Sequence, residues 1–183
     1  MKTYLTYGGA MAIAGAVLVL ALFFLGFHTE AAKLDSAQTI GLIGGLGIGI
    51  VCIVLGTKAR LAEVPLTEDF GYGRALGTGV MIVLFASLFG LVTNFIYFHF
   101  INPGFTDLII QAQLDKMAEK GMNGAQLEQA EKITRMVMKP GLQAIFGFCG
   151  GMFSGTIISL ITAAFLKRPA NDEVAAENPP PLG

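Results

Sequence analysis

The stretch that decides the fold is FGYGRALGTGVMIVLFASLFGLVTNFIYFHFINPGF, residues Phe70–Phe105. It has a basic residue at Arg74, no charge from Ala75 to Ile101, and a stop at Asn102-Pro103-Gly104. At 1.5 Å per residue, the uncharged run is long enough to cross a hydrocarbon core of about 30 Å. An aromatic collar, Tyr97-Phe98-His99-Phe100, marks its end as a membrane interface. The stretch therefore predicts a membrane-spanning helix.

Three similar runs surround this stretch, in a chain that is 54% hydrophobic and only 14% charged, with a mean hydropathy of +0.65. These values are typical of a membrane protein rather than a soluble domain. A cleaved signal peptide is the alternative for the first run, but secretory apolar regions are usually shorter. We predict one all-α polytopic domain, residues 1–168, with four spans at about 5–27, 39–56, 75–101 and 141–166.

The second and fourth spans contain glycines at four-residue spacing. In lipid, small residues at this spacing let two helix backbones approach closely, so we interpret both sets as helix-packing faces. The fourth-span groove is expected to receive the second span. A phosphate-binding loop is the alternative for the second span, but no Gly-Lys-Ser/Thr ending follows. The packing glycines are Gly41, Gly45 and Gly49 in the second span and Gly147, Gly151 and Gly155 in the fourth.

Polar residues in and before the third span lead to two further expectations. Asn94 lies inside the span and is costly to leave facing lipid, so it should face another helix. Thr67-Glu68-Asp69 combines a capping residue with two acids, which favours a helix N-terminus before the membrane.

Between the third and fourth spans, about residues 104–139, charges return and apolar residues recur with helical spacing. Gly121 breaks the first helix, and Asn123 with Gln126 three residues later forms a capping box for the second. We predict an amphipathic helical hairpin on or just above one membrane surface, with a weakly helical solvated linker as the alternative.

The four spans put both ends of the domain on one side of the membrane. The 12 Lys and Arg residues divide equally between the two sides, but those on the terminal side lie directly beside the spans. We therefore expect cytoplasmic termini and an outer hairpin. Residues 169–183 are acidic and proline-rich, and we expect a disordered tail.

Two histidines, His28 and His99, lie at the predicted outer ends of the first and third spans. Imidazoles there could contact a haem or pigment, or bind a metal. We favour ordinary interfacial side chains, because two histidines without neighbouring cysteines or converging carboxylates make an incomplete site. We predict no cofactor, no metal and no catalytic residue.

The pattern resembles a known family. Its features are four spans, a polar lead ending in Phe70-x-x-Gly73, the aromatic exit from Tyr97 to Pro103, and a helical insert before a glycine-rich fourth span. These resemble the domain-of-unknown-function family 4199, small bacterial inner-membrane proteins, over nearly the whole chain to about Arg168. The resemblance implies a bacterial inner-membrane location and four spans. It implies no activity and no catalytic residue.

Two classes of function remain. A transporter or channel would need charged or polar groups along a path, whereas the predicted spans contain no Asp, Glu, Lys or Arg. An accessory subunit of a membrane complex needs only packing faces, and we favour this non-enzymatic role. Besides lipids, we expect protein partners or a second copy, and no nucleic acid. The hairpin, residues 106–139, together with the outer ends of the first and third spans, is the expected partner surface, with surplus apolar residues such as Ile110, Met117, Met122, Met136 and Met138.

Overall fold

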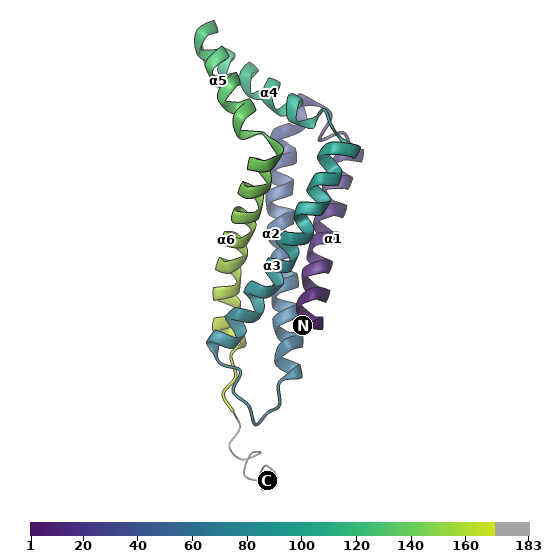
Figure 1. Cartoon of the computed structure of the whole chain (residues 1–183), viewed down its shortest axis with the longest axis vertical. Coiled ribbons are helices and arrows are strands. Elements are labelled where there is room, and N and C mark those ends of the chain that lie inside the picture. Colours follow the sequence, from purple (N-terminus) through teal and green to yellow (C-terminus); the bar gives the residue numbers. More distant parts are fainter. Residues whose placement is uncertain (171–183) are drawn as a thin grey trace.

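The computed structural model describes residues 1–170, and all of its regular elements in that range are helical. Figure 1 shows four long helices in one bundle, capped at one end by two shorter helices. The elements are α1 (Lys2–Phe24), η1 (Ala31–Lys33), α2 (Leu34–Glu63), α3 (Tyr72–Ile96), η2 (Tyr97–Ile101), α4 (Phe105–Glu119), α5 (Gly124–Val137) and α6 (Pro140–Leu166).

Four helices of the described chain are long and apolar enough to cross a membrane: Lys2–Phe24, Ala31–Glu63, Tyr72–Ile101 and Pro140–Leu166. The predicted all-α polytopic fold is confirmed. α2 and α3 each contact the other three long helices, and α3 is the central one because its contacts with α6 and α1 are the most extensive. We call the end of the bundle that contains Lys2 and Leu166 the terminal end, and the end that carries α4 and α5 the hairpin end (Figure 1).

Helix boundaries differ from the predicted spans where polar residues continue a helix beyond the apolar run. α2 extends to Glu63 rather than ending near residue 56, and Arg60 pairs with Glu63 across one turn at 2.7 Å. Charged side chains at the end of a span leave the membrane without breaking the helix, since their backbone groups still bond along the chain. The span predicted at 39–56 is thus the apolar part of a longer helix.

The expected cap at Thr67-Glu68-Asp69 is wrong. α3 begins at Tyr72 after an extended Gly71, and no side chain caps it. The acidic segment instead holds Arg74, whose guanidinium Nη1 donates to the Glu68 carboxylate at 3.0 Å and to the Asp69 carbonyl at 2.8 Å. The segment therefore packs back along the first turn of α3 rather than extending it.

The terminal end is closed by a short antiparallel bridge between Phe70 and Arg168, with reciprocal backbone hydrogen bonds of 2.9 Å. The Arg168 guanidinium also donates to the carbonyls of Val64 and Pro65, both at 2.9 Å. Phe70 is completely buried against Val64, Ala75 and Ala163. This end of α6 is thereby fastened to the α2–α3 loop.

The hairpin forms as predicted. Gly121, with a φ of 84°, ends the first helix in a conformation that favours glycine. Both hydrogen bonds of the capping box are present, since Asn123 and Gln126 each accept from the other's backbone N–H at 3.0 Å. Figure 1 shows α4 crossing the hairpin end and α5 returning beside it, so that both project beyond the bundle on the side of α6. Residues 171–183, most of the predicted tail, lie outside the described residues.

Candidate functional site

The hairpin end of the described chain contains a large cleft, with a volume of about 830 Å³. It lies mainly between α3 and α6, with Met11 and Ala12 of α1 and Gly45 of α2 at its back. Figure 1 shows the cause, since α6 diverges from α3 toward the hairpin. Because both helices are candidate spans, the cleft opens within the membrane-spanning part of the bundle.

The two histidines have separate environments. His28 is buried, and its Nδ1 lies 2.6 Å from the Tyr97 hydroxyl. Asn102 donates to the His28 carbonyl at 3.0 Å and to the Tyr97 hydroxyl at 3.2 Å. The ring of Phe105 lies 4.4 Å from the His28 ring. The arrangement ties the loop after α1 to the end of the third span and to the first residue of α4.

Burial lowers the pKa of His28, because the charged imidazolium is disfavoured away from water. Its hydrogen-bond partners, Tyr97 and Asn102, are neutral at physiological pH. Nothing in that set of contacts compensates a positive charge. The geometry describes a neutral histidine with a structural role.

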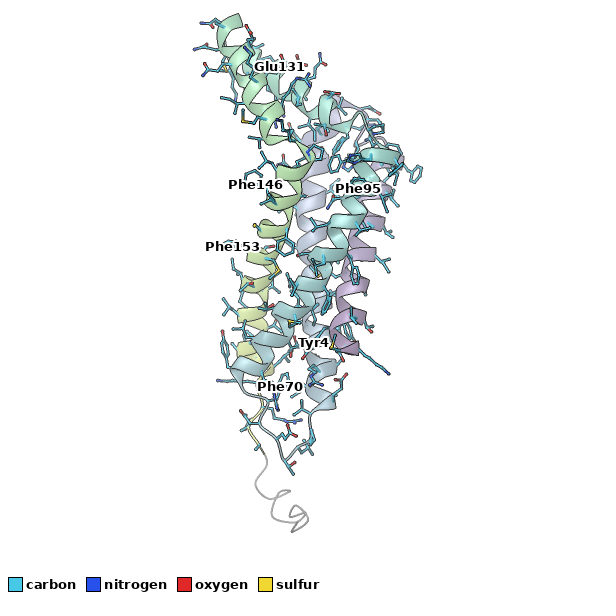
Figure 2. The ribbon with its side chains drawn as sticks, viewed as in Figure 1. Tyr4, Phe70, Phe95, Glu131, Phe146 and Phe153 are labelled. Carbon is cyan, nitrogen blue, oxygen red and sulfur yellow. The ribbon has the colours of Figure 1, made fainter. Side chains whose placement is uncertain are left out.

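His99 lies instead on the wall of the large cleft. It is exposed, stacks on Phe95 with ring centroids 4.2 Å apart, and its Nδ1 lies 3.1 Å from the Phe95 carbonyl oxygen. A carbonyl oxygen only accepts, so Nδ1 is the protonated nitrogen and Nε2 is the free acceptor in the neutral ring. Figure 2 shows Phe95, its stacking partner, near the hairpin end of α3.

Asn94 lines clefts toward neighbouring helices, but its amide bonds within its own helix. Its side chain is exposed, and its amide Nδ2 donates to the Gly90 carbonyl of the same helix at 3.0 Å. The residue lines the large cleft and also a smaller one of about 330 Å³ between α1 and α3. This hydrogen bond within the helix lowers the free-energy cost of placing an amide in lipid. The sequence led us to expect that a neighbouring helix alone would supply the partner.

The glycines of α6 face α3 rather than α2, which corrects the expected pairing. A Cβ at Gly155 would lie 2.5 Å from the Val83 side chain, and one at Gly151 would lie 3.2 Å from the Ser87 hydroxyl. A Cβ at Gly147 would meet nothing within 4 Å. The contact thus loosens turn by turn toward the hairpin end, because α6 diverges from α3.

In α2, the predicted glycines make looser contacts than others that the sequence argument did not single out. A Cβ at Gly49 would touch Ile158 and Met11 at 3.5 Å, one at Gly41 would reach Leu22 at 4.0 Å, and one at Gly45 would meet nothing. By contrast, a Cβ at Gly56 would lie 2.5 Å from Ile82, and one at Gly44 would lie 2.7 Å from Leu18. Spacing alone did not distinguish these positions.

The surface of the hairpin also differs from expectation at one residue. Ile110 is only 2% exposed and cannot contribute to an outer surface, whereas Met136 is 59% exposed. α5 has no buried residue and presents Ile133 and Val137 to the outside as well. Arg135 bonds Glu131 and Asp107, which raises its pKa and links α5 to α4. We call Ile133, Met136 and Val137 the α5 patch.

Within residues 1–170, no three His, Cys, Asp or Glu side chains are grouped as metal ligands. Sequence reasoning missed Gln143, which lines the large cleft from α6 and donates to the Met138 sulfur at 2.9 Å. In the sequence, Gln143 is a single polar residue near the start of an apolar helix, and no neighbouring residue indicates that it shares a cleft with Asn94 and His99. Only the splay of α6 brings these three residues to one cleft.

The comparisons with known proteins give one match. A family model described as "Protein of unknown function (DUF4199)" matches residues 6–168. No curated protein and no solved structure matches the chain.

Proposed function

Because the chain belongs to the DUF4199 family, whose description names no activity, we propose from geometry that it is an accessory subunit of a larger membrane complex. The observation that carries the proposal is the α5 patch. Exposed apolar side chains at the tip of a bundle favour association, and methionine adapts to irregular partner surfaces. α5 leaves these side chains uncovered although it packs on α4.

A small transporter is the second candidate, and the large cleft is the feature that favours it. Transport of a charged solute needs ionisable groups along the path. No Asp, Glu, Lys or Arg is among the residues that line the cleft. Toward the terminal end, the close contact of Gly155 with Val83 closes the space between α3 and α6. These observations favour the accessory role over transport.

The test compares two variants of the tagged protein purified in mild detergent. In the first, Ile133, Met136 and Val137 are replaced by Ser, which removes the α5 patch. In the second, Glu128 and Lys132, an exposed ion pair on the same helix, are replaced by Ser. Mass spectrometry of co-purifying proteins should show partners with the native chain and the second variant, but not with the first. A lone 19.3 kDa species from native membranes would contradict the subunit role.

The membrane location and orientation belong to the same proposal. We infer a bacterial inner membrane with the terminal end in the cytoplasm, because Lys58, Arg74, Lys167 and Arg168 lie beside the ends of spans there. Gly121 is an exposed turn with open space around it and tolerates an insertion. A reporter active only in the periplasm should be active at Gly121 and silent after Gly183. The reverse pattern would overturn the orientation.

A further inference from the structure

The large cleft has the length and volume of a site for a hydrocarbon chain. From Val83 to His99, its α3 wall rises about 24 Å at 1.5 Å per residue. Its volume of about 830 Å³ lies within the roughly 300–1,000 Å³ of pockets that hold small organic ligands. A hydrocarbon chain can therefore lie along the α3 wall.

Amide and imidazole groups are found at one end of this groove. The half nearer the terminal end is lined by Met11, Ala12, Val83 and Ala86, with the small hydroxyls of Ser87 and Ser154, and Ser154 donates to the Gly150 carbonyl at 2.9 Å. At the hairpin end, Asn94, His99 and Gln143 line the groove among the rings of Phe95 and Phe98. Such a distribution fits an amphiphile whose chain lies deep and whose head group lies at the hairpin end.

Each of the three polar side chains keeps a free acceptor. Each also uses one N–H within the chain: Asn94 to Gly90, His99 to Phe95, and Gln143 to Met138. The two amide oxygens and the His99 Nε2 accept no hydrogen bond from the residues that the structure describes, and each amide nitrogen has a second N–H. A head group that donates through an ammonium and accepts through a phosphate matches this set of atoms.

A charged residue adjoins this end. Lys139 is exposed and directly precedes Pro140, which lines the groove. An interfacial lysine is attracted to lipid phosphate. A phosphate at this end can pair with the Lys139 cation while an ammonium group donates to the neutral acceptors, so each half of a zwitterionic head group has a suitable partner.

We propose that the α3–α6 cleft binds a phospholipid with a primary ammonium head group, its acyl chain lying between Val83 and Gly147. The ammonium donates to Asn94, His99 and Gln143, and the phosphate lies toward Lys139. The site is independent of the hairpin's partner surface, so each proposal can fail without the other.

The test uses native mass spectrometry of the purified full-length chain with lipids of identical acyl chains. Phosphatidylethanolamine should bind at least about tenfold more tightly than phosphatidylcholine, because the methylated ammonium has no N–H to donate. Phosphatidylglycerol tests whether an anionic head group with hydroxyls binds as well, and diacylglycerol tests whether a hydroxyl without a phosphate is enough for binding. Equal binding of the ethanolamine and choline lipids, or a preference for phosphatidylglycerol, would overturn the proposal.

Two glycines of α6 provide a matched pair of variants, since a Cβ at either would meet nothing within 4 Å. Gly147 lines the cleft and Gly150 does not. Gly147→Leu should fill the groove and weaken binding of every lipid about tenfold or more, while Gly150→Leu should bind as the native chain does. Unchanged binding by Gly147→Leu places the lipid elsewhere and refutes the site.

A third variant tests recognition of the head group. Asn94→Leu removes one acceptor from an exposed side chain and leaves the backbone of α3 unaltered. It should lower phosphatidylethanolamine binding toward that of phosphatidylcholine without weakening the latter. The native chain could instead form a dimer in detergent with no bound lipid, and Gly147→Leu could abolish that dimer. In that case the occupant of the cleft is a second copy, and the lipid proposal is wrong.

Discussion

The two halves of α6 are both uncharged and largely apolar, yet their surroundings are very different. In the terminal half, Gly155 and Ser159 are buried against α3, and the helix ends in the Arg168 bridge. In the hairpin half, Ile145 and Phe146 are about 60% exposed, and Gly147 touches nothing. Apolar sequence therefore specifies where a helix is inserted, while close approach of side chains determines where it packs. The cleft is the consequence of this difference.

The largest expected effect is at the closed end. Phe70→Ala removes a ring that is 0% exposed from the cluster around Val64 and Ala163, and should lower the free energy of unfolding by about 3–5 kcal/mol. Phe146→Ala, on the hairpin half of α6 (Figure 2), is the control and should cost far less, since 60% of its surface is exposed. Thermal unfolding in detergent measures both. Similar losses would mean that the two ends are equally packed.

A graded series along α6 sharpens the comparison. Gly155→Ala places a Cβ 2.5 Å from Val83 and should cost about 1–3 kcal/mol through overpacking. Gly151→Ala, with 3.2 Å to the Ser87 hydroxyl, should cost less. Gly147→Ala should be neutral or stabilising by up to about 1 kcal/mol, because alanine favours the helix and meets no atom. The order of the three melting temperatures is the result to check, and a reversed order would refute the splay of α6.

The sequence predicts where the helices lie along the chain, but it does not predict which helices pack against one another. Uncharged runs, the Gly121 turn and the Asn123–Gln126 capping box are local signals, and all three are confirmed. The choice of α3 as the partner of the Gly155 face depends on contacts between distant segments, which the glycine period cannot encode. The same limit explains Gln143. Its role depends on the divergence of two helices, and no residue near it in sequence signals that divergence.

A third prediction concerns pH at the hairpin end. Because the pKa of His28 is lowered below its ordinary 6.5, the unfolded chain binds the proton more readily than the folded one. Stability should be complete above about pH 7 and should fall as the pH drops below that value, by at most about 1.4 kcal/mol per pH unit. The groups that contact His28 are the Tyr97 hydroxyl, the Asn102 amide and the Phe105 ring, so no acid there offsets the charge.

His28→Gln is the matching control, because it cannot titrate. Its unfolding free energy should be lower than that of the native chain at pH 8, since the Tyr97 contact is altered, but it should lose less stability between pH 7 and pH 5. Parallel pH profiles for the native chain and His28→Gln would show that another group is responsible.

The smallest expected effect is that of breaking an ion pair between the hairpin and α2. Lys116 of α4 and Asp35 of α2 form an ion pair of 2.5 Å, with side chains 51% and 74% exposed. A pair so open to water contributes only about 0–1 kcal/mol, and salt screens it. Ile110 on the same helix is 2% exposed, and Ile110→Ala should cost about 2–5 kcal/mol.

Comparing a variant of the ion pair with a variant of Ile110 tests whether charge or apolar burial stabilises the hairpin. If apolar burial stabilises the hairpin, Asp35→Asn and 0.5 M salt should each change the midpoint of unfolding only slightly. Salt should change the midpoint of the Asp35→Asn variant even less, because the ion pair that salt screens is absent from it. Proteolysis within α4 would report loosening of the hairpin. It should increase in Ile110→Ala and stay unchanged in Asp35→Asn, because burying one isoleucine stabilises the hairpin more than an exposed charge pair does. Increased cleavage in Asp35→Asn alone would show that charge holds the hairpin in place.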